Sequence, residues 1–95
     1  MTMKKKELIV TSALPYANGP LHFGHLLEHI QTDIWVRSQR ILGNHCIYLC
    51  ASDAHGTPIM MKAEEENIAP EKLVDKYMKT HKKTLEAFQV SHDCY

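Results

Sequence analysis

Three histidines fall within one stretch, "LHFGHLLEH", and a carboxylate lies in a second polar stretch, "ASDAHGT". His22 and His25 are three residues apart, so both rings would lie on the same side of a helix. At a helix start they would adjoin unpaired backbone N–H groups and the positive end of the helix dipole, which suits a phosphate. Imidazole N–H groups can also stabilise charge that grows on a phosphoryl group, without a covalent intermediate. The carboxylate of Asp53 suits an ammonium group.

These residues lie in loops that follow two expected strands. An apolar, β-branched run from Leu8 to Ser12 predicts the first strand, and "HCIYLCA" predicts a second from Cys46 to Ala51. Between them, apolar residues recur at helical spacing from Phe23 to Ile41, and Gly43 with Asn44 marks the end of that helix. Strand, helix and strand then form a βαβ unit with parallel strands and a right-handed crossover.

Three helices are expected to pack through apolar faces. The face of the first helix comprises Phe23, Leu26, Leu27, Ile30, Ile34 and Ile41. Thr57 followed by Pro58 predicts the N-cap and first-turn proline of a second helix that continues to about Glu66. Pro70 opens a third helix. Its expected face comprises Leu73, Val74, Tyr77, Met78, Leu85 and Phe88.

Both polar loops belong to one edge of the expected sheet. In an open α/β sheet, ligands bind outside the carboxyl ends of the strands. The loop from Leu14 to His25 follows the first strand, and the loop from Ser52 to Thr57 follows the second, so the two should converge. Phosphate donors beside an ammonium acceptor indicate a site for ATP and an amino acid. Gly24 would leave room for a flat base against the backbone.

The composition excludes several classes of partner. Eleven Lys and Arg residues balance 11 Asp and Glu residues, so no basic field exists to hold nucleic acid or an anionic membrane. No apolar segment has the length of a bilayer span, and the first apolar run is broken by Thr11, Ser12 and Pro15. We therefore expect no signal peptide and no membrane partner. Three cysteines without a secretory signal predict reduced thiols and a cytoplasmic location.

Two stretches taken together point to a family. "TSALPYANGPLHFGHLLEHIQTDIWVRSQR" and "CASDAHGTPIMMKA", at their spacing, resemble methionyl-tRNA synthetases, which are class I aminoacyl-tRNA synthetases. The stretch that ends on the family's H-I-G-H signature comprises Pro15, Tyr16, Ala17, Asn18, Gly19, Pro20, Leu21, His22, Phe23, Gly24 and His25. The resemblance covers essentially the whole chain. It implies the amino-terminal βαβ portion of a Rossmann-like (HUP-type) nucleotide-binding fold, followed by helices.

The resemblance also implies a reaction and roles for single residues. The family uses ATP, accompanied by Mg²⁺, to convert L-methionine to methionyl-adenylate, and then transfers the methionyl group to tRNA(Met). By position, His22, Gly24 and His25 would bind ATP, and Asp53 would bind the α-ammonium of methionine. The methionine pocket would be lined by Ala13, Leu14 and Tyr16, with the Tyr16 hydroxyl or a nearby backbone N–H as the polar contact to the sulfur. His22, His25 and Asp53 are therefore the expected catalytic residues, and we expect no metal ligand in this chain.

The sequence departs from the family pattern in several respects. Phe23 replaces a small aliphatic residue of the signature, a change that should be tolerated if the ring packs under the helix. The lysine-rich second signature does not occur in residues 1–95. The insertion in which structural Zn²⁺ is expected is missing too, as is the anticodon-binding domain through which tRNA would bind. We therefore expect residues 1–95 to be the amino-terminal part of the catalytic domain, inactive by itself.

Other interpretations remain open. The string "HLLEH", from His25 to His29, matches the H-x-x-E-H pattern of a zinc-peptidase class, in which two histidines bind zinc and the glutamate acts as base. Cys46 and Cys50, with His45, are alternative metal ligands, although alternate residues of a buried strand also suit a core. A further alternative is a non-catalytic nucleotide- or metal-binding module of the same βαβ shape. The histidines expected to be surface or packing residues are His29, His45, His81 and His92.

Overall fold

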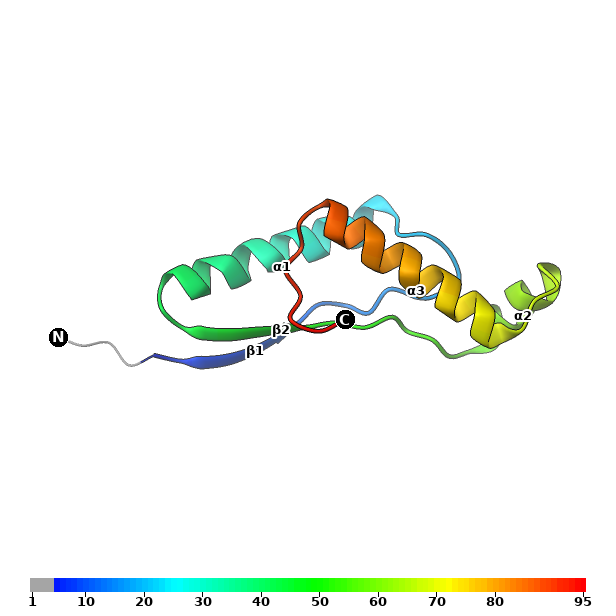
Figure 1. Ribbon diagram of the computed structural model, residues 1–95, viewed down its shortest axis with the longest axis horizontal. Coiled ribbons are helices and arrows are strands. Elements are labelled where there is room, and N and C mark those ends of the chain that lie inside the picture. Colours follow the sequence, from blue (N-terminus) through cyan, green and yellow to red (C-terminus); the bar gives the residue numbers. More distant parts are fainter. Residues whose placement is uncertain (1–4) are drawn as a thin grey trace.

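A computed structural model of the chain describes residues 5–95 (Figure 1). Two strands, β1 (Glu7–Thr11) and β2 (His45–Leu49), flank the helix α1 (Phe23–Ile41) in the sequence. The helices α2 (Thr57–Glu65) and α3 (Pro70–Ala87) follow. The strands pair in parallel, and α1 lies along one side of them (Figure 1). This arrangement confirms the predicted βαβ unit and the α/β fold class.

The C-terminal segment lies beside β2 and extends its backbone pairing. Within the sheet, Leu8 of β1 lies opposite Cys46 of β2. At the end of β2, the backbone N–H of Cys50 donates to the carbonyl of Cys94 at 3.0 Å. The last residues of the chain thus return to the centre of the molecule, where Figure 1 shows the C-terminus next to β2.

Backbone pairing also joins the two loops predicted to form the site. Tyr16 and Asp53 form an isolated parallel bridge. The Asp53 N–H donates to the carbonyl of Pro15 at 2.7 Å, and the Ala17 N–H donates to the carbonyl of Asp53 at 2.9 Å. The predicted convergence of the loops after β1 and β2 is therefore confirmed at the level of the backbone.

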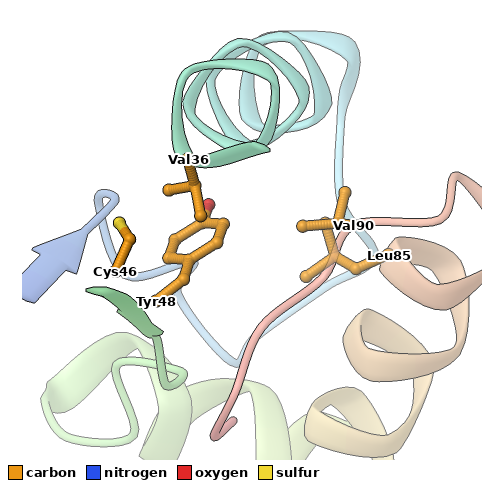
Figure 2. Packing of buried hydrophobic residues seen from close by; sticks show 5 residues of the cluster. All are labelled: Val36, Cys46, Tyr48, Leu85 and Val90. Atoms are coloured by element: carbon orange, nitrogen blue, oxygen red, sulfur yellow. The ribbon is translucent and has the colours of Figure 1, made fainter. Parts of the chain in front are cut away.

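The helix α1 packs through a narrow stripe that mixes polar and apolar residues, in which Leu26 and Ile30 of the predicted face contact the hydrophobic cluster that contains Val36 and Tyr48. Its buried residues are His29, Asp33 and Val36, and Figure 2 shows Val36 beside the ring of Tyr48. Much of the predicted apolar face is instead exposed: Phe23 by 77%, Leu27 by 45%, Ile34 by 62% and Ile41 by 85%. The ring of Phe23 therefore does not pack under the helix, and the condition set for tolerating it in the signature is not met. A sheet of two strands can cover only one stripe of a helix, and the other faces of α1 meet no second layer within residues 5–95.

Two hydrophobic clusters form the interior. One comprises Val36, Cys46, Tyr48, Leu85 and Val90 (Figure 2), and so joins α1, β2, the end of α3 and the segment after it. The other comprises Ala17, Ile59, Ala63 and Leu73, and so joins the first loop to α2 and α3. Phe88, predicted to belong to the face of α3, is 54% exposed. The helix has ended by then, and the chain turns at Gln89, whose φ is 59°.

The helix boundaries agree with their sequence signals, with one shift. Gly43 has a φ of 89° just after the C-cap of α1, as its predicted role as a stop requires. At α2, the N-cap is Gly56 and not Thr57, so Thr57 and Pro58 occupy the first two helical positions. Gly56 has a φ of 122°, a conformation that glycine adopts with little strain. The helix therefore begins one residue earlier than predicted.

The molecule is elongated, with principal extents of 62 × 20 × 16 Å and a radius of gyration of 16.1 Å. A globular domain of this length would have a radius of gyration of about 12 Å. The two clusters therefore lie along the long axis instead of forming one central core. No helix among residues 5–95 combines the length and the apolar character that crossing a membrane requires.

Candidate active site

His22 and His25 cap the amino-terminal end of α1 reciprocally. The Nδ1 of His22 accepts a hydrogen bond from the backbone N–H of His25, and the Nδ1 of His25 accepts one from the N–H of His22, each at 3.4 Å. The rings stack with centroids 3.6 Å apart and planes inclined by 20°. Because each Nδ1 accepts a hydrogen bond, a neutral ring must carry its proton on Nε2. The pair therefore offers two Nε2–H donors side by side.

Free backbone donors remain at the same helix end. The N–H of His25 is bonded to the His22 ring, and the N–H of Leu26 donates to the His22 carbonyl at 3.2 Å. Among residues 5–95, the N–H groups of Phe23 and Gly24 find no hydrogen-bond partner. An anion at this point would meet two ring donors, two amide donors and the positive end of the helix dipole.

The absence of a side chain at Gly24 leaves room for the ring of His22. A Cβ at position 24 would lie 3.0 Å from Cε1 and 3.1 Å from Nδ1 of His22. A side chain at this position would require the His22 ring to shift by a few tenths of an ångström. This function of the glycine was not predicted from the sequence, and the expected contact with a flat base stays a prediction.

The surroundings of His25 favour its neutral form. Partial burial is the main cause that lowers the pKa of His25, and a positive charge on nearby His22 lowers it further. The carboxylate of Glu28 raises the pKa by a smaller amount. The net shift is downward, so His25 is uncharged at neutral pH. A neutral His25 keeps the lone pair on Nδ1 that caps the helix and the N–H on Nε2 that can donate to a ligand.

Asp53 follows β2 and its side chain is exposed. One carboxylate oxygen accepts a long hydrogen bond of 3.5 Å from the N–H of His55. No hydrogen bond or ion pair among residues 5–95 links Asp53 to His22 or His25. The structure therefore brings the two loops together through the Tyr16–Asp53 backbone bridge, and it leaves the carboxylate apart from the imidazoles.

The residues expected to line a methionine pocket differ in their surroundings. Tyr16 is half-buried, and its hydroxyl lies so close to Gly56 that a Cβ there would be 2.6 Å away. Ala13 and Leu14 are exposed. A separate cleft of about 400 Å³ lies between α2, α3 and the loop before them, and Gly56 belongs to its lining. The methionine pocket itself stays a prediction.

Two fully buried histidines hold the first loop near its two ends. His29 Nε2 donates to the carbonyl of Ala13 at 3.2 Å, and His81 Nε2 donates to the carbonyl of Gly19 at 2.6 Å. The Nδ1 of His81 accepts a hydrogen bond of 3.1 Å from the hydroxyl of Ser52, the residue that precedes Asp53. His81 thus connects both loops of the site. Packing or surface roles were predicted for both histidines, because partners 16 and 62 residues away leave no local pattern in the sequence.

The zinc-peptidase pattern does not form. The Nδ1 of His25 is engaged in the helix cap, and the Nε2 of His29 contacts the carbonyl of Ala13. Between them, a carboxylate oxygen of Glu28 accepts from the Ala13 N–H at 3.0 Å. The three side chains therefore have separate partners.

The proposed metal set of Cys46, Cys50 and His45 does not form either. Cys46 is buried in the first hydrophobic cluster, and His45 is exposed. Cys50 lies instead beside two other histidines, His29 and His92, which the sequence analysis had not combined with it.

Comparison with known proteins identifies the family of the chain and finds similar structures. A family model described as tRNA synthetases class I (M) matches residues 8–95. A structure of Mycobacterium tuberculosis methionyl-tRNA synthetase in complex with methionyl-adenylate is similar, with a TM-score of 0.86 and 26% sequence identity over 96% of this chain. A second structure of the M. tuberculosis enzyme, bound by methionyl-adenylate, has a TM-score of 0.85 and 26% identity over 95% of this chain. The chain spans only 18% and 17% of the lengths of those two proteins.

Proposed function

This chain belongs to the class I tRNA synthetases (M), and on that premise we propose that it supplies the amino-terminal part of the catalytic domain of a methionine–tRNA ligase. In the proposed first step, a carboxylate oxygen of L-methionine bonds to the α-phosphorus of ATP, and the bond from that phosphorus to pyrophosphate breaks. The methionyl group of the resulting methionyl-adenylate then passes to tRNA(Met). Methionyl-adenylate, the product of this first step, is bound in the two similar M. tuberculosis structures, which supports the proposal.

The observation that carries the proposal is the stacked pair of His22 and His25. Their Nε2–H donors and the free amides of Phe23 and Gly24 lie at the start of one helix. The reciprocal cap holds the rings in place before a ligand arrives. Donors fixed in advance stabilise charge that grows on a phosphoryl group without first having to reorganise. We therefore assign the phosphates of ATP to this helix end.

The amino acid is assigned to the edge formed by the two paired loops. Asp53 is exposed there and would accept hydrogen bonds from the α-ammonium group of methionine. Ala13, Leu14 and Tyr16 would line the side chain. Gly56 would matter indirectly, because it leaves the space that the Tyr16 hydroxyl occupies.

Magnesium, the expected companion of ATP, is usually held by the phosphates, water and one or two carboxylates, and we assign it no ligand among residues 5–95. Mg²⁺ prefers oxygen ligands. The one group of three metal-binding side chains among residues 5–95 offers two imidazoles and a thiol. We therefore derive no catalytic step through Mg²⁺.

The remaining partner and the compartment follow from charge and cysteine chemistry. We assign tRNA(Met) to domains outside residues 1–95, because this chain has no net charge with which to attract nucleic acid. We place the protein in the cytoplasm, in keeping with the three free thiols of Cys46, Cys50 and Cys94.

The phosphate assignment can be tested in an enzyme that joins this chain to the remaining domains of the family. His22→Ala removes the ring donor and the helix cap together, whereas His22→Asn removes the ring donor and keeps a side chain that caps helices well. Both variants, and His25→Ala, should lower the rate of adenylate formation by about a hundredfold, the cost of losing one preorganised donor. Methionine affinity should change little. A near-normal rate for His22→Asn would reduce the role of His22 to capping.

The ammonium assignment has a different signature in the same enzyme. Asp53→Ala should weaken methionine binding by about 2 to 5 kcal/mol if the bound site is closed to water, because an ammonium group would lose its charged partner. The isolated 95-residue chain should show no methionine-dependent exchange of pyrophosphate into ATP, since it lacks the lysine-rich signature. If Asp53→Ala left methionine affinity intact while the histidine variants weakened it, the division of roles would be wrong.

A further inference from the structure

A second group of reactive side chains lies behind the first loop. His29 of α1, Cys50 after β2 and His92 of the C-terminal segment bring one nitrogen or sulfur atom each to within 4.8 Å of one another. Among residues 5–95 no other three histidine, cysteine or acidic side chains meet this condition. His29 is fully buried, Cys50 is 8% exposed and His92 is half-buried. The group is thus assembled from three segments that are distant in the sequence.

The hydrogen bonds of His29 define which of its nitrogens can bind a metal. A carbonyl oxygen only accepts, so the Nε2 that faces the carbonyl of Ala13 at 3.2 Å must carry the proton. In the neutral ring, Nδ1 then carries the lone pair, which can accept from the Ser12 hydroxyl at 3.1 Å, and this atom lies 3.4 Å from the Nε2 of His92. Histidines that bind metals usually donate their other N–H to a carbonyl or a carboxylate in this way. His29 is therefore already oriented as a ligand.

The spacing of the atoms fits a tetrahedral ion. With Zn–N bonds of about 2.0 to 2.1 Å, two nitrogen ligands of a tetrahedral zinc lie about 3.3 to 3.4 Å apart. The observed His29–His92 distance is 3.4 Å. The hydroxyl oxygen of Ser12 lies 3.1 Å from Nδ1 of His29 and 3.8 Å from the sulfur of Cys50. The Ser12 hydroxyl, which also bonds to that of Tyr48 at 2.9 Å, thus lies beside two of the three groups, and the sulfur of Cys50 lies within 4.8 Å of both ring nitrogens.

We propose that His29, Cys50 and His92 bind a single zinc ion, with the fourth position at Ser12 or a water molecule. As the zinc–sulfur bond forms, the thiol of Cys50 releases its proton to solvent, so charge and atoms balance. Two imidazoles and a thiolate are a donor set that zinc accepts readily. Bound zinc would tie the C-terminal segment to α1 and to the end of β2. This proposal is independent of the proposed ligase activity.

The protonation states of His29 and His92 suit metal binding, whereas Cys50 must first lose a proton. Burial is the main cause that lowers the pKa of both His29 and His92, so both rings are neutral and able to bind a metal at pH 7. Burial raises the pKa of Cys50, so its thiol keeps its proton until a metal displaces it. Zinc uptake should therefore be accompanied by proton release.

The test is metal binding by the purified 95-residue chain, with zinc or cobalt(II) chloride as the only added ligand. Equilibrium dialysis followed by metal analysis should find about one zinc per chain, as for a single closed site. Cobalt should give the visible bands of tetrahedral coordination together with a thiolate charge-transfer band in the near ultraviolet. Cys50→Ser should abolish the thiolate band, and Cys94→Ser, which changes an exposed thiol outside the group, should keep it.

Variants at His92 separate loss of a ligand from loss of the fold. This residue lies near the chain end and is only half-buried, so His92→Ala should retain the far-ultraviolet circular dichroism of the parent while losing the bound metal. His92→Cys supplies another zinc ligand and should restore binding with a stronger thiolate band, whereas His45→Ala should bind like the parent. Failure to bind about one zinc per chain, cobalt bound without the thiolate band, or undiminished binding by His92→Ala would each overturn the proposal.

Discussion

Replacing His81 tests whether the long-range contacts of the first loop stabilise the fold. The imidazole is fully buried and joins Gly19 to Ser52 by bonds of 2.6 and 3.1 Å. Leucine has a similar volume and no polar atom, so His81→Leu deletes both hydrogen bonds without creating a large cavity. Ser52 keeps a second partner, since its hydroxyl lies 2.7 Å from that of Tyr95. In the variant, the carbonyl of Gly19 loses its bond to the imidazole and can be satisfied only by water.

The expected cost follows from these two bonds. Each hydrogen bond contributes about 0.5 to 1.5 kcal/mol net, so His81→Leu should lower the free energy of unfolding by about 1 to 3 kcal/mol. A chain of this length is stable by only about 5 to 14 kcal/mol, so the loss is a substantial fraction of the total. Urea unfolding can be followed by the fluorescence of Trp35, the single tryptophan of the chain.

The same substitution at an exposed histidine provides the control. His45→Leu, on the surface of β2, should change the free energy of unfolding by less than about 0.5 kcal/mol. In the enzyme with all domains, His81→Leu should also slow adenylate formation, because the two loops of the site would no longer be joined. Equal unfolding curves for His81→Leu and His45→Leu would refute the reasoning, since the bridge would then contribute nothing to stability.

Two further predictions concern acid stability and a glycine. Burial by itself would raise the pKa of Asp33, but hydrogen bonds, above all from Ser91, lower it below its ordinary value of 3.8, so the fold favours the carboxylate. The resulting stabilisation is present above pH 3.8 and is lost as the pH falls through the lowered pKa; thermal unfolding should show this loss in the parent and not in Asp33→Asn. Gly56→Ala should cost about 1 to 3 kcal/mol in urea unfolding, through its φ and the clash with the Tyr16 hydroxyl. The same change at Gly19, where nothing lies within 4 Å, should cost clearly less.

The order and bounds of the elements were predictable because their signals are local. The span of α1 agrees with its predicted bounds, and Gly43 ends it as expected. The parallel pairing of β1 and β2 followed from their apolar character and the helix between them. The N-cap of α2 was wrong by one residue, because Thr57 is a common cap and nothing local showed that Gly56 would take an unusual φ.

The candidate site was predictable in its backbone and not in its contacts. The sequence placed His22 and His25 together at a helix start, but it did not reveal that the rings cap the helix and stack. Their neighbours His29 and His81 bind carbonyls far along the chain, and only the folded structure brings such partners together. Burial on α1 was not predictable for the same reason. Apolar residues at helical spacing show which face could be buried, but exposed Ile34 shows that they do not determine which element, if any, covers that face.

The reciprocal cap links the first turn of α1 to the acidity of its solution. Serine or asparagine accepts a backbone hydrogen bond at any ordinary pH, whereas an imidazole that gains a second proton has no lone pair left. Protonation of His25 therefore removes one half of the cap, because its Nδ1 can no longer accept from the N–H of His22. At low pH the first turn of α1 would therefore fray, and its two ring donors and two amide donors would lose their arrangement together. A helix end capped by histidines is thus less stable in acid than one capped by serine or asparagine, but it provides ring N–H donors that those residues lack.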